Sequence, residues 1–151
     1  MALNIVLVEP EIPNNTGNIG RLSLATGANL HLVKPFGFDL TDTRLKRAGL
    51  DYWQHINVIY YENITEFFQI NATKKMAFLS SHGTKTHWNI PFEDDLFLVF
   101  GKESAGLDKS ITDKYKEHLY KIPLHSQHIR SINLANAVAI TTYEGLRQLS
   151  L

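Results

Sequence analysis

The sequence predicts a single α/β domain with a mostly parallel β-sheet and helices on both faces. Short apolar or β-branched runs alternate along the chain with amphipathic stretches, which is the pattern of helices packed on such a sheet. Several of these runs are apolar throughout, as is typical of strands covered on both faces. At 151 residues the chain is close to the commonest size of one domain, and no linker or repeat divides it. We therefore expect one domain over residues 1–151.

Six apolar or β-branched runs are predicted strands: residues 3–8, 30–33, 57–61, 76–80, 96–100 and 118–122. A first helix is predicted to begin near Thr16, with Asn15 or Thr16 as its N-cap, and to end at Gly27. The clearest helix covers residues 133–149, where one stripe repeats at helical spacing. The stripe consists of Leu134, Val138, Thr141, Gly145 and Leu149. The polar segment 81–91 is the longest predicted loop.

Composition excludes several classes of protein. Fifteen basic and fifteen acidic residues give a formal net charge of zero, so a polyanionic partner needs a local basic patch. The chain has no cysteine, which excludes disulfides and thiolate chemistry and favours a cytoplasmic location. The longest apolar run, residues 96–100, is far shorter than the roughly 20 residues of a membrane span. No basic region precedes the first strand, so we expect neither a signal peptide nor a membrane anchor.

The familiar nucleotide, nucleophile and metal motifs are absent. Gly17 and Gly20 are only part of a dinucleotide fingerprint, and Leu96 stands where a phosphate loop needs its first glycine. Ser104 does not have the glycine spacing of a nucleophile elbow. The histidines form no HExxH pattern, so we expect no metal site.

Three segments combine polar residues and glycines at predicted strand ends. Residues 14–21 place three asparagines and Arg21 after the first strand, where α/β sheets bind ligands, although turns and caps use the same residue types. Residues 100–107 contain two glycines around Lys102 and Glu103, which indicates either a ligand-facing loop or a tight turn with solvated charges. Residues 122–138 bring Ser131, a second candidate helix cap, and Asn133 to the start of the longest helix.

In this order, residues 14–21, 101–107 and 122–138 resemble the three motifs of the SPOUT superfamily of RNA methyltransferases. The opening residues 3–13, the segment 47–52 and Tyr143–Glu144 resemble more narrowly the small TrmL (YibK-type) tRNA wobble-position 2′-O-methyltransferases. This resemblance covers nearly the whole chain. It implies a trefoil knot at the C-terminus, which general topology rules would have excluded.

The resemblance also implies an activity and its residues. The expected reaction is S-adenosylmethionine-dependent 2′-O-methylation of nucleotide 34 of tRNA, a cytidine or a 5-carboxymethylaminomethyl-type uridine. The matching cofactor residues are Leu79, Gly101, Ile122 and Ser131. The matching catalytic residues are Arg21, Asn133 and Tyr143. Members form homodimers that share catalytic groups. The arginine guanidinium stays protonated at neutral pH, so Arg21 cannot act as a free base. We therefore expect Arg21 to position the hydroxyl and to stabilise charge.

A basic cluster, Arg44, Lys46 and Arg47, lies close to Tyr52 and Trp53. Cations beside aromatic rings suit RNA phosphates and bases, although an ordinary solvated helix face has the same composition. Some SPOUT relatives carry a further basic tail beyond the position of Leu151, and if that tail grips tRNA, binding here is weaker.

Three other functions compete with this one. The protein could methylate another RNA site, or it could be a knotted RNA-binding protein without activity. A phosphoacceptor receiver domain is the third, because Glu9, Glu11, Ser80 and Lys102 mimic its layout. However, no aspartate ends the third strand and no proline follows Lys102.

Overall fold

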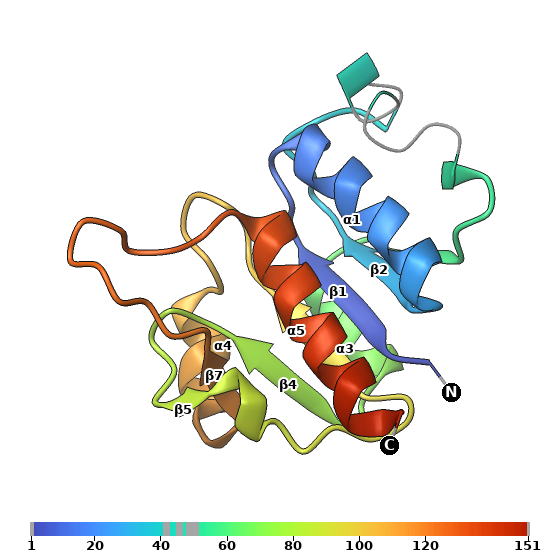
Figure 1. Cartoon of the computed structure of the whole chain (residues 1–151). Coiled ribbons are helices and arrows are strands. Elements are labelled where there is room, and N and C mark those ends of the chain that lie inside the picture. The colour runs from blue at the N-terminus through green and yellow to red at the C-terminus, as the bar shows by residue number, and fades with distance from the viewer. Residues whose placement is uncertain (1, 41–42, 45–46, 48–51, 151) are drawn as a thin grey trace.

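A computed structural model of the chain describes residues 2–40, 43–44, 47 and 52–150 (Figure 1). Within them, seven strands form one sheet in the order β3-β2-β1-β6-β4-β7-β5, and neighbouring strands pair in parallel. The strands are β1 (Asn4–Val8), β2 (Asn29–Val33), β3 (Val58–Tyr61), β4 (Met76–Leu79), β5 (Lys85–Thr86), β6 (Phe97–Phe100) and β7 (Leu119–Lys121). The helices are α1 (Pro13–Thr26), α3 (Ile64–Ile70), α4 (Lys109–Lys114) and α5 (Leu134–Leu149), with 3-10 turns η1 (His87–Asn89) and η2 (Lys116–His118).

The helices cover both faces of the sheet, as predicted. Helices α1 and α5 lie side by side on one face, whereas α3 and α4 lie behind the sheet in Figure 1. Alternate strand residues point to opposite faces, so β1 sends Ile5 to the cluster under α1 and α5 and sends Val6 to the cluster under α3 and α4. Every residue of β1 and β6 is buried, which confirms that their apolar runs are central strands.

The six predicted strands are present within one or two residues of their expected ends. The predicted loop 81–91 is interrupted by the edge strand β5 and by η1. Two residues of β5 pair with β7, a length too short for any periodicity to predict. The longer irregular segment is instead residues 122–133, which projects from the body between β7 and α5 (Figure 1).

Helix α1 begins earlier than the sequence predicts. Its N-cap is Ile12, with Pro13 in the first turn, and no side chain of its own caps it. Proline suits this position because its fixed φ is already helical and its missing N–H needs no partner. The predicted caps Asn15 and Thr16 are therefore wrong, and both lie buried inside the helix. The predicted end is confirmed, since Gly27 is left-handed with φ 74°.

Helix α5 begins as predicted and is capped by Asn133, whose Oδ1 accepts hydrogen bonds from the backbone N–H groups of Ala135 (2.9 Å) and Asn136 (3.3 Å). Ser131 is therefore not the cap. The predicted apolar stripe faces the sheet at Val138, Thr141 and Gly145, which are buried. A Cβ at Gly145 would lie 2.7 Å from the Phe92 ring, so any larger residue here would force that ring to shift.

A buried polar network ties β1, β2 and β3 together. His31 is 3% exposed, and its ring nitrogens contact the Tyr61 hydroxyl (2.8 Å) and Asn4 Oδ1 (2.9 Å). Asn71 Nδ2 donates to the same hydroxyl at 3.1 Å. Because burial disfavours the imidazolium, the pKa of His31 is lowered to about 4.

Among the described residues, no helix is long and apolar enough to cross a membrane.

Candidate active site

A groove of about 1370 Å³ opens at the carboxyl ends of β1, β4, β6 and β7. The loops that follow these strands line it, together with the first turn of α1 and the start of α5. Parallel sheets usually bind ligands at this edge, because the strand ends and helix starts converge there. Typical ligand pockets have about 300–1,000 Å³, so this groove has room for more than one small molecule.

Glu103, from the loop after β6, supplies the cap that α1 lacks. Its carboxylate accepts hydrogen bonds from the backbone N–H groups of Glu11 (2.8 Å) and Ile12 (2.9 Å) and from Asn15 Nδ2 (3.2 Å). These two backbone N–H groups belong to the N-cap Ile12 and to the residue before it, so neither has a partner inside the helix. An anion suits this place because it also faces the positive end of the helix dipole. The loop after β6 is thereby fixed to the start of α1.

Two further contacts join the loops after β1 and β6. The Glu11 carboxylate accepts hydrogen bonds from the Ser104 N–H (2.8 Å) and hydroxyl (3.0 Å), and these bonds lower the pKa of Glu11. Lys102 Nζ lies 2.9 Å from Glu9 Oε1, and this carboxylate raises the pKa of Lys102. The alternative of simply solvated charges at Lys102 and Glu103 is therefore wrong.

Asn15 connects all three sequence segments. Its Nδ2 donates to Glu103, and its Oδ1 accepts a hydrogen bond of 3.1 Å from Asn133 Nδ2. Asn133 in turn caps α5. Segments from the beginning, middle and end of the sequence therefore meet in one hydrogen-bonded chain at the groove.

The four predicted cofactor residues, Leu79, Gly101, Ile122 and Ser131, all line this groove. They come from the ends of β4, β6 and β7 and from the segment before α5. At Gly101 a Cβ would overlap the backbone of Gly106 and Leu107, so only glycine allows the loop to fold back on itself. The wall therefore combines apolar side chains with closely approaching backbone.

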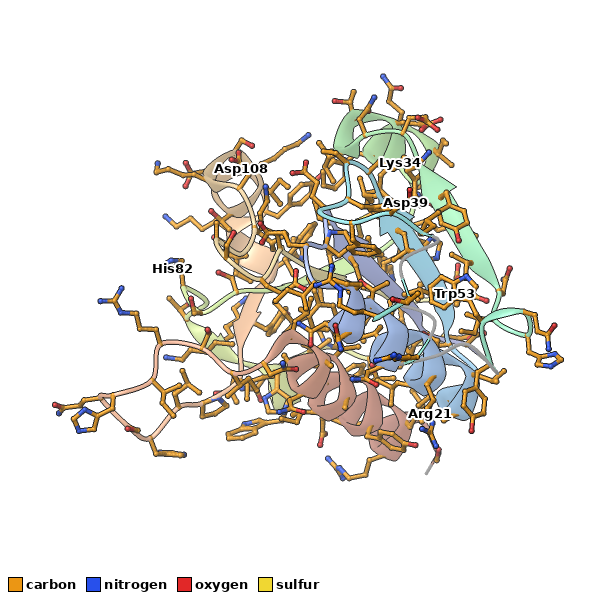
Figure 2. The ribbon with its side chains drawn as sticks, turned by 90° about the horizontal axis from the view of Figure 1, so that it is seen from above. Arg21, Lys34, Asp39, Trp53, His82 and Asp108 are labelled. Carbon is orange, nitrogen blue, oxygen red and sulfur yellow. The ribbon has the colours of Figure 1, made fainter. Side chains whose placement is uncertain are left out.

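The three predicted catalytic residues are separated. Asn133 lines the groove, but Arg21 on α1 and Tyr143 on α5 do not. Both are on the outer surface, and Tyr143 is 52% exposed. Figure 2 places Arg21 at the far side of the molecule from His82 and Asp108, which line the groove.

The predicted RNA-binding residues lie between β2 and β3. Arg44 and Arg47 are exposed and do not line the groove, and Lys46 lies outside the described residues. Among the described residues, no three histidine, aspartate or glutamate side chains gather in a metal-binding arrangement.

Sequence reasoning missed the roles of Asn15 and Glu103. The sequence carried one weak signal, an acidic residue between the glycines of a loop expected at the same sheet edge as the start of the first helix. It does not identify Asn15 as the partner of Glu103, because the two positions are 88 residues apart.

The fold and the groove define an α/β protein with a candidate ligand groove at the carboxyl ends of its parallel strands. The chain belongs to the SpoU rRNA Methylase family, whose pattern matches residues 2–143. This membership excludes the receiver alternative.

Several relatives within the family have names that state a particular activity. The chain is 44% identical to a tRNA (cytidine(34)-2'-O)-methyltransferase of Saccharophagus degradans, over 97% of this chain and 95% of that protein. It is 37% identical, with a TM-score of 0.94, to a solved structure described as giving insights into 2-OH methylation of C/U34 on tRNA, over 99% of this chain and 97% of that one. The fold also matches the SpoU methyltransferase AviRb from Streptomyces viridochromogenes in complex with AdoMet, with a TM-score of 0.84 and 22% identity, over 97% of this chain and 57% of that one.

Proposed function

We propose that this protein transfers a methyl group from S-adenosylmethionine to the ribose 2′-hydroxyl of nucleotide 34 of tRNA, a cytidine or a 5-carboxymethylaminomethyl-type uridine. The observation that carries the proposal is the hydrogen-bonded chain from Glu103 through Asn15 to Asn133, which joins the three methyltransferase-like segments at one groove. The family and the tRNA (cytidine(34)-2'-O)-methyltransferase relatives support the same reaction.

The groove fits the cofactor. Leu79 and Ile122 offer apolar surface, Gly101 allows the loop after β6 to fold back on itself at the groove wall, and Ser131 offers a hydroxyl. S-adenosylmethionine supplies an activated methyl group on a sulfonium, with a neutral leaving group. The protein must therefore bind the cofactor, align the acceptor oxygen with it and exclude competing water. Asn133 is well placed for alignment because both ends of its amide are held.

The acceptor needs help from residues outside the groove. A ribose hydroxyl is a weak nucleophile at neutral pH, so a positioned group must orient it and stabilise its developing charge. Arg21 has the planar, permanently charged fork for this role, and Tyr143 offers a hydroxyl. An RNA phosphate could take the proton in such an arrangement. Since both side chains lie outside their own groove, each site in this proposal is completed by a second copy of the chain.

A homodimer is therefore part of the proposal. The outer faces of α1 and α5 expose Leu24 (39%) and Ile140 (41%) close to the positions of Arg21 and Tyr143 in the sequence. Contact through these faces would cover apolar surface and bring Arg21 to the partner's groove. On the RNA side, we propose that Arg44, Lys46 and Arg47 contact phosphates of the anticodon arm. Without cysteines, and with tRNA as its substrate, the protein is expected to work in the cytoplasm.

We further propose the trefoil knot expected from the SPOUT resemblance. Three contacts support it, because they hold segment 83–92 against the C-terminal part of the chain. Gly83 packs on the backbone of Tyr120 and Lys121, and the Phe92 ring packs on Gly145. Gln148 Nε2 donates to the Trp88 carbonyl at 3.0 Å. The segment is thus in contact with β7 before the projecting loop and with α5 after it.

The decisive experiment is to map 2′-O-methyl nucleotides in tRNA incubated with the pure protein and S-adenosylmethionine. Methylation at nucleotide 34 supports the proposal, methylation elsewhere indicates another RNA site, and tRNA binding without methylation indicates an inactive RNA-binding protein. Arg21→Ala should abolish transfer and leave cofactor affinity unchanged. Unchanged turnover in that variant would remove Arg21 from the mechanism.

A further inference from the structure

The segment that contains Tyr52 has a contact that the proposed reaction does not yet explain. The guanidinium carbon of Arg21 lies 4.9 Å from the centroid of the Tyr52 ring. Within the described residues, this ring is the partner of the Arg21 side chain, which otherwise has neither a hydrogen bond nor an ion pair. An arginine on α1 is therefore held by an aromatic ring from the segment between β2 and β3.

The backbone that carries the Tyr52 ring is fixed by the residues next to it in the chain. The Trp53 ring packs so closely on α1 that a Cβ at Gly20 would lie 2.7 Å from it. Burial raises the pKa of the Tyr60 hydroxyl on β3 and Trp53 partly offsets this effect, so the Trp53 and Tyr60 side chains are neighbours. A helical turn follows, in which the Tyr52 carbonyl accepts a hydrogen bond of 2.9 Å from the His55 N–H. Figure 2 shows Trp53 and Arg21 on the same side of the molecule.

We propose that Tyr52 is a positioning residue for the reaction, which holds the Arg21 guanidinium flat against its ring so that the N–H groups point toward the ribose or phosphate of the RNA. This inference rests on the role given to Arg21 in the proposed function. Tyr52 itself need not touch the substrate.

The physical reason is the geometry of the two groups. A cation stacked over an aromatic face is attracted by the negative face of the ring, and the stack uses none of the N–H groups at the guanidinium edge. An exposed arginine without such a support samples many rotamers, and ordering it costs free energy in each reaction cycle. A ring whose neighbour in the chain, Trp53, is packed on α1 removes part of that cost before the RNA binds.

The contact is tested first without any activity. The Arg21 Nε–Hε signal in a nitrogen–proton NMR spectrum, assigned with Arg21→Lys, should be displaced from the free-arginine position by the ring current of Tyr52. Tyr52→Phe keeps the ring and should keep this displacement. Tyr52→Leu and Tyr52→Met remove the ring and should return the signal to the free position. An Arg21 signal that stays unchanged in both ring-less variants overturns the proposal.

The consequence is tested by kinetics on tRNA with the same variants, alongside their thermal midpoints and cofactor affinities. We expect kcat to fall about five-fold in Tyr52→Leu and Tyr52→Met, because the cation–π contact is lost and the guanidinium is misplaced. Thermal midpoints and cofactor affinity should stay the same, and Tyr52→Phe should match the wild type. Wild-type turnover in the ring-less variants, or a loss in Tyr52→Phe as large as in them, contradicts a positioning role. If the wild-type protein itself transfers no methyl group, the proposed function fails, whereas the NMR result still decides the contact.

Discussion

Replacing Glu103 tests whether a residue from the middle of the chain caps the first helix. In Glu103→Ala, the backbone N–H groups of Glu11 and Ile12 and the amide of Asn15 lose their acceptor. Loss of a helix cap costs about 0.5–2 kcal/mol, and loss of a negative charge at a helix N-terminus adds about 0.3–1 kcal/mol. We expect the free energy of unfolding to fall by about 1–3 kcal/mol.

Glu103→Gln refines the test. One oxygen remains to accept a hydrogen bond, but the new NH2 group faces a backbone N–H, and the charge is gone. Its loss should be smaller than that of Glu103→Ala, about 1–2 kcal/mol. For a domain of this size, each kcal/mol corresponds to about 2–4 °C in Tm. The matched control is Glu62→Gln, which removes an exposed ion pair with Lys34 and should change stability by less than about 0.5 kcal/mol.

Urea unfolding at one fixed protein concentration measures both variants, because dimerisation would make the midpoint depend on concentration. The midpoint should move while the m-value stays constant. If Glu103→Ala is as stable as Glu62→Gln, water satisfies the start of α1 equally well, and Glu103 is not its cap.

Three other predictions concern stability and binding. The pKa of His31 is lowered from 6.5 to about 4, so the unfolded chain binds this proton more readily than the folded chain. The free energy of unfolding should therefore fall by about 3 kcal/mol in total as the pH falls from about 6.5 toward 4. Urea midpoints of His31→Gln should fall less over this range than those of the wild type, and parallel curves would contradict the assignment. Gly101→Ala should abolish cofactor binding, measured by calorimetry, because its Cβ overlaps the backbone of the same loop. In Gly106→Ala the Cβ meets no atom, so this variant should still bind the cofactor, with a backbone strain of about 1 kcal/mol from its positive φ. Equal binding by both variants would refute the packing argument. Asn133→Asp keeps the acceptor that caps α5 but loses the donor to Asn15. The melting temperature measured by circular dichroism should therefore change little, while methyl transfer falls. A melting temperature as low as that of Asn133→Ala would show that the cap was lost too.

Much of the fold could be predicted from local sequence. The central strands were recognisable because a strand buried on both faces must be apolar at every position, as β6 is. The end of α1 was recognisable because the left-handed conformation at Gly27 suits glycine. Helix α5 was recognisable because its buried stripe repeats at the helical period. Each of these features depends on residues that are neighbours in the chain.

The site depended on partners that are distant in the chain. The start of α1 was misjudged because its cap is Glu103, about 90 residues away. The edge strand β5 was missed because its two residues are ordered by β7 and not by their own pattern. The resemblance to known motifs named Leu79, Gly101, Ile122 and Ser131, and the structure brings all four to one groove.

The sequence by itself determined the α/β class, the central strands, the two long helices and the three polar segments, because hydrophobic period and turn chemistry are local properties. Only the tertiary structure decided that Asn15, Glu103 and Asn133 share one hydrogen-bonded chain and that Arg21 and Tyr143 face away from it. The reason is that a hydrogen bond between distant residues depends on how the sheet orders its strands, and that order is not encoded in any single segment.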